Sequence, residues 1–220
     1  MTKPPRPSPG PSPESHAISA DYRLDLGDEE ITERHREVLE AAAALFAEKG
    51  YAATSVRDIG EKVGLLGGSL YYYIRSKEEL FVRIHEIALR MGARRLTAAI
   101  AGASDPWERL TLACVTMLEI QLDPQSLTMP MMNEMRVLPA EVRARLVPQR
   151  DAIEAIYARL IADLPLADDI DRDVYRLLLL TLLNNVSGWY RAGRLSPDDI
   201  GRQIARLFRH ERPADGPPGA

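Results

Sequence analysis

The chain has 220 residues, of which 45% are hydrophobic and 27% charged, the balance of a globular protein with a sizeable core. Its formal net charge of −4 excludes a polycation, so any nucleic-acid binding must come from a local patch. The single cysteine excludes an intramolecular disulfide and a multi-cysteine zinc site, and the four scattered histidines match no metal-ligand spacing. No apolar stretch reaches the roughly 20 residues of a membrane helix, and the N-terminus lacks the apolar centre of a signal peptide. We therefore expect a cytoplasmic protein that holds no metal and no other cofactor.

Both ends of the chain are predicted to be disordered tails. Residues 1–28 are rich in Pro, Ser and Asp and have almost nothing to bury, and residues 212–220 have a similar composition. Between the tails, helical patterns follow one another without a convincing strand. The sequence therefore predicts an all-α fold of about nine helices.

The first helical pattern covers residues 33–50. Val38, Ala42, Leu45 and Phe46 follow the spacing of one helix face, and Gly50 is the expected C-terminal stop. Four later segments show the start signal of a helix, a capping side chain followed three residues later by an acidic one. These pairs are Ser55 with Asp58, Ser76 with Glu79, Asp105 with Glu108, and Ser196 with Asp199. Proline at the first helical position strengthens the last two signals.

The middle of the chain is interrupted by Pro130, Pro139 and Pro148, each of which can start or kink a helix. We expect a short helix near residues 126–136 and a long one over 139–164, bent at Pro148.

The stretch GLLGGSLYYYIRSKEEL (64–80) lies between a helix at 55–63 and the helix capped at Ser76. Only residues 65–74 remain between them, so a tight turn at Gly64 and a second short helix would complete a helix-turn-helix. In that helix Leu70 points inward. At least two of the tyrosines at 71–73 must then face outward, because neighbouring residues lie about 100° apart. Exposed tyrosines suit the phosphates, sugars and base edges of DNA.

Residues 36–80, REVLEAAAALFAEKGYAATSVRDIGEKVGLLGGSLYYYIRSKEEL, closely resemble the N-terminal DNA-binding domain of the TetR (tetracycline-repressor) family. The resemblance implies a helix-turn-helix domain over 29–78, a ligand-binding and dimerisation domain over 79–211, and a homodimer that binds palindromic operator DNA. Carried over by position, the family's DNA contacts fall on Ser55, Val56, Arg57, Gly67, Gly68, Ser69, Tyr71, Tyr72, Tyr73 and Lys77, the last on a phosphate.

Two departures from the family pattern reduce the donors available for base edges. Leu66 and Gly67 stand where a serine-like cap and often a lysine are usual, and Tyr73 and Ile74 replace histidine and phenylalanine. Residues 31–86 contain eight basic and nine acidic side chains, a net charge of −1. DNA binding would therefore need the basic side chains to gather on one face. The alternative is a regulator-like helical protein that acts through protein–protein interaction without DNA binding.

Residues 171–193 carry two apolar stripes on one helix. Leu179, Leu180 and Leu183 form one stripe, and Val174, Leu177, Leu178, Thr181 and Leu182 form the other. A helix that is apolar on two sides needs two partners, its own core and either another part of a monomer or a second copy of the chain. The helix at 197–210 could complete a two-fold, four-helix interface.

A ligand cavity is expected in the C-terminal bundle, although plain core packing explains its methionines equally well. The candidate lining residues are Trp107, Met117, Met132, Asn133, Tyr157, Asn184 and Trp189. Asn184 could instead be a polar spot in the dimer seam. The segments GLLGGSLYYYIRSKEE and WYRAGRLSPDDIGRQIARLF together are similar to a subgroup that includes acyl-CoA-thioester-responsive repressors, which implies an acyl-CoA-like or other bulky apolar effector.

No nucleophile paired with a base and no phosphate-binding loop is present in the sequence, so no catalytic residue is proposed and the chain is not expected to be an enzyme. The interpretation is a transcriptional repressor. Its effector would swing the long helix after Ser76, change the spacing of the two recognition helices and release the DNA.

Overall fold

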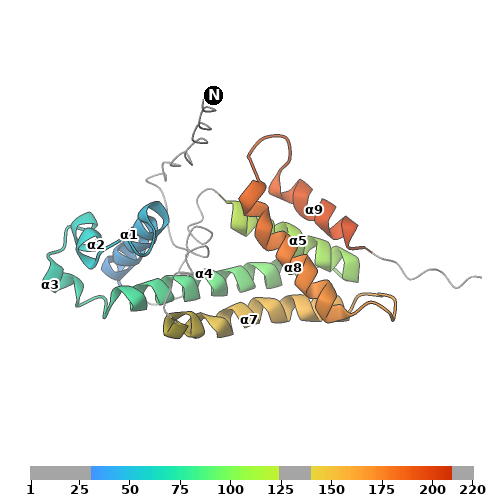
Figure 1. The fold of residues 1–220 in the computed structure, drawn as a ribbon, viewed down its shortest axis with the longest axis horizontal. Helices are drawn as coiled ribbons and strands as arrows, with labels where there is room; N and C mark the ends of the chain where they lie inside the picture. Colours follow the sequence, from blue (N-terminus) through green and yellow to red (C-terminus); the bar gives the residue numbers. More distant parts are fainter. Residues whose placement is uncertain (1–30, 124–139, 210–220) are drawn as a thin grey trace, which may run out of the picture.

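The computed structural model describes residues 31–123 and 140–209, and all regular secondary structure in these ranges is helical (Figure 1). The predicted all-α class is confirmed. The helices are α1 Glu33–Lys49, α2 Val56–Lys62, α3 Gly67–Leu70, α4 Lys77–Ile100, α5 Pro106–Leu122, α7 Ala140–Ala162, α8 Arg172–Trp189 and α9 Pro197–Leu207. The two predicted tails and the short helix expected at 126–136 fall outside the described residues. The long helix expected over 139–164 is α7, which continues through Pro148.

Side-chain caps start six of these helices. The four predicted caps, Ser55, Ser76, Asp105 and Ser196, each accept a hydrogen bond from the backbone N–H three residues later. Thr32 and Asp171 cap α1 and α8 in the same way. Each such cap is worth about 1 kcal/mol, so the starts of these helices are set by local sequence.

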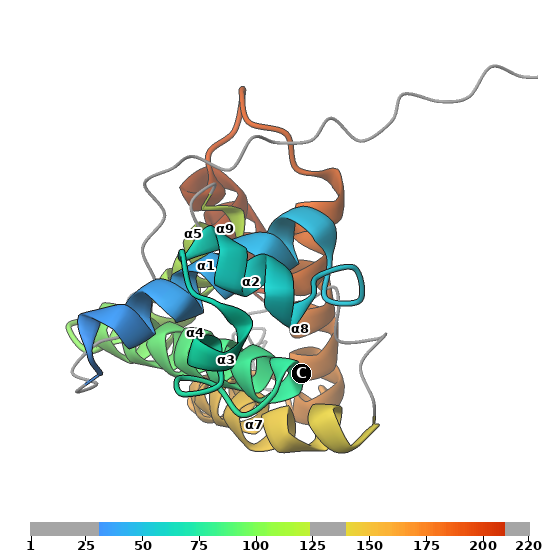
Figure 2. The ribbon, with the colours of Figure 1, turned by 90° about the vertical axis from the view of Figure 1, so that its left-hand side faces the viewer.

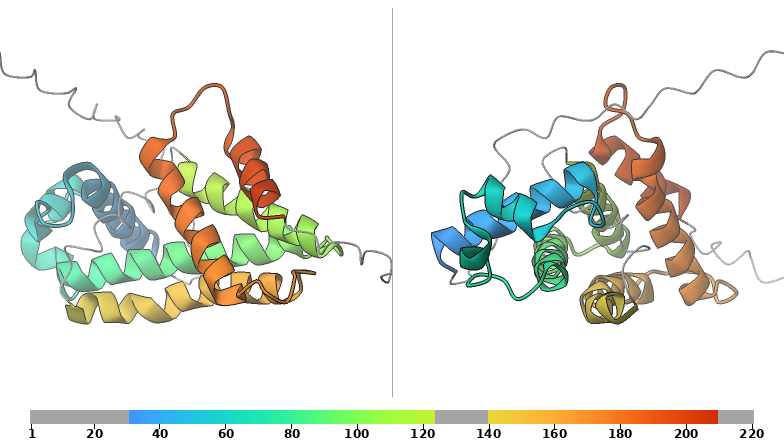
Figure 3. Two further views of the ribbon diagram at one scale, coloured as in Figure 1. Left: turned by 45° about the vertical axis from the view of Figure 1, so that its right-hand side comes forward. Right: turned by 60° about the vertical axis from the view of Figure 1, so that its left-hand side comes forward.

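The long helix α4 connects two groups of helices. Helices α1, α2 and α3 gather around its first turns, and α5, α8 and α9 lie toward its other end (Figures 1 and 2). Helix α7 begins beside the start of α4 and runs along it, while α8 lies obliquely against α5 and α7 (Figure 3). The molecule is elongated as a result, with α3 at one tip.

The N-terminal core is centred on Phe46, Tyr51 and Phe81, whose rings meet edge to face or tilted at centroid distances of 4.8–5.6 Å. Such contacts add to the burial energy of the rings. Val142 and Leu146, from the first turns of α7, are also buried in this core. The core that supports α3 is therefore built from residues far apart in the sequence.

The C-terminal core includes buried side chains from α4, α5, α7, α8 and α9. Helices α5 and α9 approach closely at Gly201, where an added Cβ would lie 2.7 Å from the Cα of Val115. Tyr157 is fully buried, and its hydroxyl donates to the carbonyl of Ala113 at 3.0 Å. None of the helices in the described ranges is both long enough and apolar enough to cross a membrane.

Candidate nucleic-acid interface

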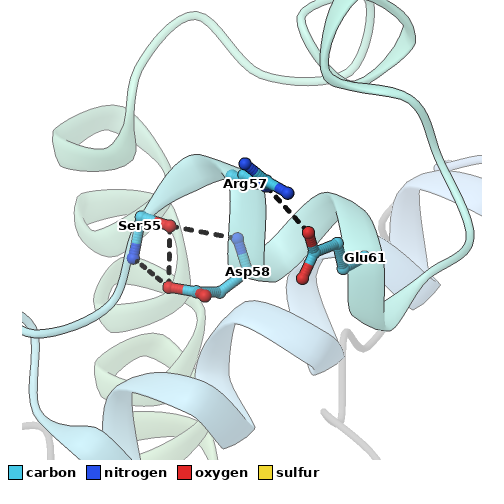
Figure 4. A network of polar contacts seen from close by, with 4 residues as sticks. All are labelled: Ser55, Arg57, Asp58 and Glu61. Carbon is cyan, nitrogen blue, oxygen red and sulfur yellow. Dashed lines mark hydrogen bonds and ion pairs between the residues drawn. The ribbon is translucent and has the colours of Figure 1, made fainter.

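The first turn of α2 is held by a reciprocal capping box (Figure 4). The Ser55 backbone N–H donates to Oδ2 of Asp58 at 2.7 Å, and the Asp58 backbone N–H donates to Oγ of Ser55 at 3.1 Å. Hydrogen bonds from the Ser55 hydroxyl and backbone lower the pKa of Asp58. The capping box therefore fixes the first turn of α2, from which the side chains of Val56 and Arg57 project.

Arg57 is exposed, but its guanidinium is engaged within α2. Nε donates to Oε1 of Glu61 at 2.8 Å, as Figure 4 shows. This hydrogen bond is the main reason that the pKa of Arg57 is raised. A contact from Arg57 to DNA would have to compete with Glu61, which weakens its contribution to base readout.

The turn between α2 and α3 depends on two glycines. Gly64 has φ of 65°, a left-handed conformation that glycine adopts at little cost. At Gly60, an added Cβ would lie 3.0 Å from the carbonyl oxygen of Leu65. The backbone N–H of Leu65 also donates to the Gly60 carbonyl at 2.8 Å. Helix, tight turn and second helix therefore have the predicted helix-turn-helix order.

The second helix is shorter than the sequence indicates. Helix α3 ends at Leu70, and Tyr71, Tyr72 and Tyr73 lie in the turn that follows instead of on the helix. In this turn the Tyr73 N–H donates to the Leu70 carbonyl at 2.9 Å, three residues back. Two glycines open α3 and its N-cap, Leu66, makes no side-chain hydrogen bond, so little favours a longer helix.

The tyrosine turn nevertheless presents its rings outward, as predicted. Leu70 is fully buried, and Ile74 is buried beside it in the N-terminal core. Tyr71 is 59% exposed and Tyr72 87% exposed. Tyr73 is half-buried and packs edge to face against Tyr72, with ring centroids 5.4 Å apart. Two inward anchors thus hold two outward rings on the tip of the molecule.

Lys77 makes contacts that the sequence did not suggest. Its ammonium donates to the carbonyls of Tyr51 and Thr54, both at 2.9 Å, and lies 4.3 Å from the centre of the Tyr51 ring. The Tyr51 hydroxyl in turn donates to Glu78, and burial together with that bond raises the pKa of Tyr51 to about 12. Lys77 therefore ties the start of α4 to the loop before α2. Its phosphate contact stays a prediction, for which one ammonium hydrogen remains.

Other basic side chains near α3 differ in whether the fold already engages them. Arg34 pairs with Glu37 and also donates to the carbonyl of Val63 at 2.6 Å, so it braces the turn. Lys62, at the end of α2, and Arg75, just after the tyrosine turn, are exposed. These two flank α3 in sequence and suit phosphates on either side of it. Lys62 was not among the contacts expected from the sequence.

The structure brings three of the expected cavity residues together. Trp107, Met117 and Tyr157 are buried in the C-terminal core. Burial raises the pKa of the Tyr157 hydroxyl well above its usual value and that of the neighbouring Cys114 thiol to about 12. The thiol therefore stays protonated and unreactive at neutral pH. Met132 and Asn133 fall outside the described residues.

Asn184 and Trp189 lie apart from that group. Trp189 is exposed at the end of α8. Asn184 is exposed too, and its Oδ1 accepts a hydrogen bond from Nε2 of the buried Gln121 at 2.8 Å. The Oε1 atom of Gln121 is buried without a hydrogen-bond partner, and no sequence pattern pointed to this residue.

One hollow of about 580 Å³ lies where the end of α4 meets the start of α5 and the end of α7. Ile100, Ile156 and Leu160 provide apolar lining, and Arg109 and Asp163 pair at 3.1 Å beside them. None of the described residues expected to form the effector cavity lines this hollow.

The two predicted stripes of α8 have different surroundings. Leu179, Leu180 and Leu183 are buried in the C-terminal core. Leu177 is 57% exposed and Leu178 58% exposed, and Val174 and Trp189 are exposed as well. We call Val174, Leu177, Leu178 and Trp189 the outer face of α8. On α9, Ile200, Ile204 and Ala205 are buried, whereas Leu207 is largely exposed.

Comparison with known proteins gives the same picture. Residues 38–84 match the family "Bacterial regulatory proteins, tetR family", and residues 103–211 match "Tetracyclin repressor-like, C-terminal domain". The HTH-type transcriptional repressor KstR2 of Mycolicibacterium smegmatis is 32% identical over 181 residues, which cover 79% of this chain and 88% of that protein.

Solved structures agree with these matches. The ketosteroid transcriptional regulator KstR2 of Mycobacterium tuberculosis has a TM-score of 0.65 at 25% identity, covering 81% of this chain and 94% of that chain. The TetR family regulator PfmR of Thermus thermophilus has a TM-score of 0.67 at 27% identity, covering 78% and 96% respectively. The resemblance carried by residues 36–80 is confirmed. The chain belongs to the TetR family of bacterial transcriptional regulators, proteins that are not enzymes but bind operator DNA, dimerise and take up small-molecule effectors.

Proposed function

We propose that this chain is a ligand-responsive repressor that binds palindromic operator DNA as a homodimer. Helix α3 and the tyrosine turn of each protomer would enter the major groove of one half-site. The observation that carries the proposal is the tip itself, where buried Leu70 and Ile74 anchor the exposed rings of Tyr71 and Tyr72. Relatives described as repressors support repression, not activation, of the target genes.

The proposed contacts begin with the exposed part of α2 and continue through α3. Tyrosine hydroxyls donate to phosphates, while the small residues of α3 allow its backbone to approach the groove closely. The full set is Ser55, Val56, Arg57, Gly67, Gly68, Ser69, Tyr71, Tyr72, Tyr73 and Lys77. Such a repressor would act in the cytoplasm, on the nucleoid.

The homodimer would form through residues 171–193 and 197–210, the segments of α8 and α9. The outer face of α8 supports this assignment, since an aliphatic stripe on one helix is normally covered by another helix. A two-fold pair would place two tips on one palindrome. On this division, residues 29–78 form the DNA-binding domain and residues 79–211 the ligand-binding and dimerisation domain.

The effector would enter the C-terminal bundle near Trp107, Met117 and Tyr157. The effector would be a bulky apolar molecule or an acyl-CoA thioester; the buried apolar side chains here and the ketosteroid regulator among the solved relatives support the apolar class. Movement of α4 would then separate the two tips and release the DNA.

A protein-interaction role without DNA binding is the second candidate. It is favoured by the net charge of −1 over residues 31–86 and by the pairing of Arg34 and Arg57 with acidic neighbours.

The test is operator selection followed by measurement of affinity. The purified full-length protein is used to select duplexes from a random library, and binding is then followed by fluorescence anisotropy at several salt concentrations. We expect Tyr72→Ala to weaken binding at least about tenfold. Val147→Ala, which removes an exposed apolar side chain of α7, should bind like the parent protein.

Failure to recover any duplex whose binding falls with salt would remove the repressor function and favour the protein-interaction role. Loss of binding in Val147→Ala to the same extent as in Tyr72→Ala would show that the tip has no special part in it.

A further inference from the structure

Leu66 is an exposed aliphatic side chain at the tip, and nothing within the described fold uses it. It is 83% exposed. In the described part of α1, α2, α3 and their loops, the large exposed apolar side chains are Leu66, Tyr71 and Tyr72, all within or next to α3. Exposed apolar surface confined to one spot marks a contact site more strongly than scattered residues do.

Leu66 also occupies a position where another residue would serve the helix better. Helices α1, α2, α4, α5, α8 and α9 each begin with a Ser, Thr or Asp side chain that accepts a backbone hydrogen bond. Leu66 is the N-cap of α3 and provides no such bond. The Leu66 carbonyl accepts hydrogen bonds from the N–H groups of Ser69 and Leu70, but its side chain stabilises neither α3 nor the core, so the isobutyl group is available to a partner.

Several side chains expected to contact DNA have reduced capacity for hydrogen-bonded base readout. The guanidinium of Arg57 is bound to Glu61 at 2.8 Å, and the ammonium of Lys77 is bound to two carbonyls. Gly67 and Gly68 carry no side chain. Apolar contact is a further way to distinguish base pairs in the major groove, where only thymine presents a methyl group.

We propose that Leu66 reads the methyl group of one thymine in each operator half-site by apolar contact. The proposal rests on the operator binding proposed above and names one determinant of its specificity. Tyr71 and Tyr72 would flank the contact and exclude water from it. The contact adds no charge, so it would contribute to sequence preference without changing the salt dependence of binding.

Uracil tests this directly, because it pairs as thymine does and lacks only the methyl group. Each thymine of the selected operator is replaced by uracil, symmetrically in both half-sites, and affinity is measured with the full-length dimer. At one position we expect a loss of about fourfold per half-site, or about 15-fold for both. Leu66→Ala should lose a similar factor on the thymine operator and show no further loss with uracil there.

Two further variants serve as controls. Leu66→Met keeps an apolar side chain and should keep the preference for thymine, and Val147→Ala should behave like the parent protein. Equal binding of the parent protein to thymine and uracil operators at every position would overturn the proposal while leaving operator binding intact. Unchanged discrimination in Leu66→Ala would overturn it too. Absence of binding to any duplex would overturn both this proposal and the proposed function.

Discussion

The tip around α3 and the outer face of α8 are both exposed and apolar, yet they differ in chemistry. The tip combines one leucine with Tyr71 and Tyr72, whose rings end in hydroxyl groups. The outer face of α8 combines Val174, Leu177, Leu178 and Trp189, and its aliphatic members follow helical spacing. Aliphatic groups gain most when another apolar surface covers them, whereas tyrosines keep their hydroxyls available to a wet, charged partner.

The difference shows that exposed apolar surface alone does not identify a partner. Two tyrosines on glycine-rich backbone suit the sugar–phosphate and base edges of a duplex. A row of leucines on an 18-residue helix suits a second copy of that helix. The four predictions below test this division of roles.

The largest effect is expected from charge on the outer face of α8. Leu177→Glu combined with Leu178→Glu should convert the dimer to a monomer. The change removes two leucines from each protomer, so a two-fold interface loses the burial of four leucine side chains, about 3–6 kcal/mol of dimerisation free energy in total. Sedimentation or light scattering measures the change, and operator affinity should fall with it. Val147→Glu on α7 is the matched control and should stay dimeric. A double variant that remains dimeric would show that the leucine row is not the interface.

Close packing of α9 on α5 should give the next effect. Gly201→Ala places a Cβ 2.7 Å from the Cα of Val115, so the two helices must move apart, at a cost of about 2–3 kcal/mol in unfolding free energy. Chemical denaturation measures this loss. Gly102→Ala adds a methyl group with no atom within 4 Å and should change little. Equal stability of the two variants would mean that α9 is free to shift.

Lys77→Met should affect both the folding stability of the N-terminal domain and its binding to operator DNA. Loss of the two hydrogen bonds to the Tyr51 and Thr54 carbonyls should cost about 1–3 kcal/mol of stability. If the remaining hydrogen reaches a phosphate, the salt slope of operator binding should also fall by about 0.9 per protomer. Lys62→Met, an exposed lysine, should leave stability unchanged. An unchanged salt slope in Lys77→Met would show that Lys77 makes no phosphate contact. An unchanged melting temperature would show that its two hydrogen bonds do not stabilise the fold.

The smallest effect concerns the ion pair between α4 and α7. Arg145 donates to Glu79 at 2.8 and 3.2 Å, and this is the main reason that the pKa of Glu79 is lowered. A lowered pKa stabilises the fold above the carboxyl's unfolded value, and that stabilisation is lost as pH falls through the folded value. Glu79→Gln should therefore reduce the loss of folding stability as the pH is lowered below neutrality. Because the ion pair is half-exposed, the same variant should lower the melting temperature at pH 7 by only about 1–2 °C.

The partner variant provides the control for this prediction. Arg145→Met should give the same change, and the double variant should add nothing further. Fully additive melting temperatures would show that the two side chains do not act as a pair.

Features decided by neighbouring residues were predictable from the sequence. The caps at Ser55, Ser76, Asp105 and Ser196 depend on contacts three residues apart, and the two stripes of α8 depend on helical periodicity alone. The helix-turn-helix order followed from the capped helices on either side of a short glycine-rich segment.

Features decided by distant contacts were not predictable in the same way. Lys77 bonds to carbonyls 23 and 26 residues earlier, which no local pattern encodes. The end of α3 at Leu70 reflects two buried anchors and weak helix formers together. Trp189 was expected to provide a polar contact in the cavity, but its place at the end of α8 leaves it exposed.

Val142 and Leu146 of α7 are buried among side chains of α1, α3 and α4. A headpiece cut out after the first half of α4 would lack both side chains, and a gap would remain in its apolar core. Chimeric regulators that graft this tip onto another sensor would therefore need to transplant the first two turns of α7 as well, or refill the gap with larger residues.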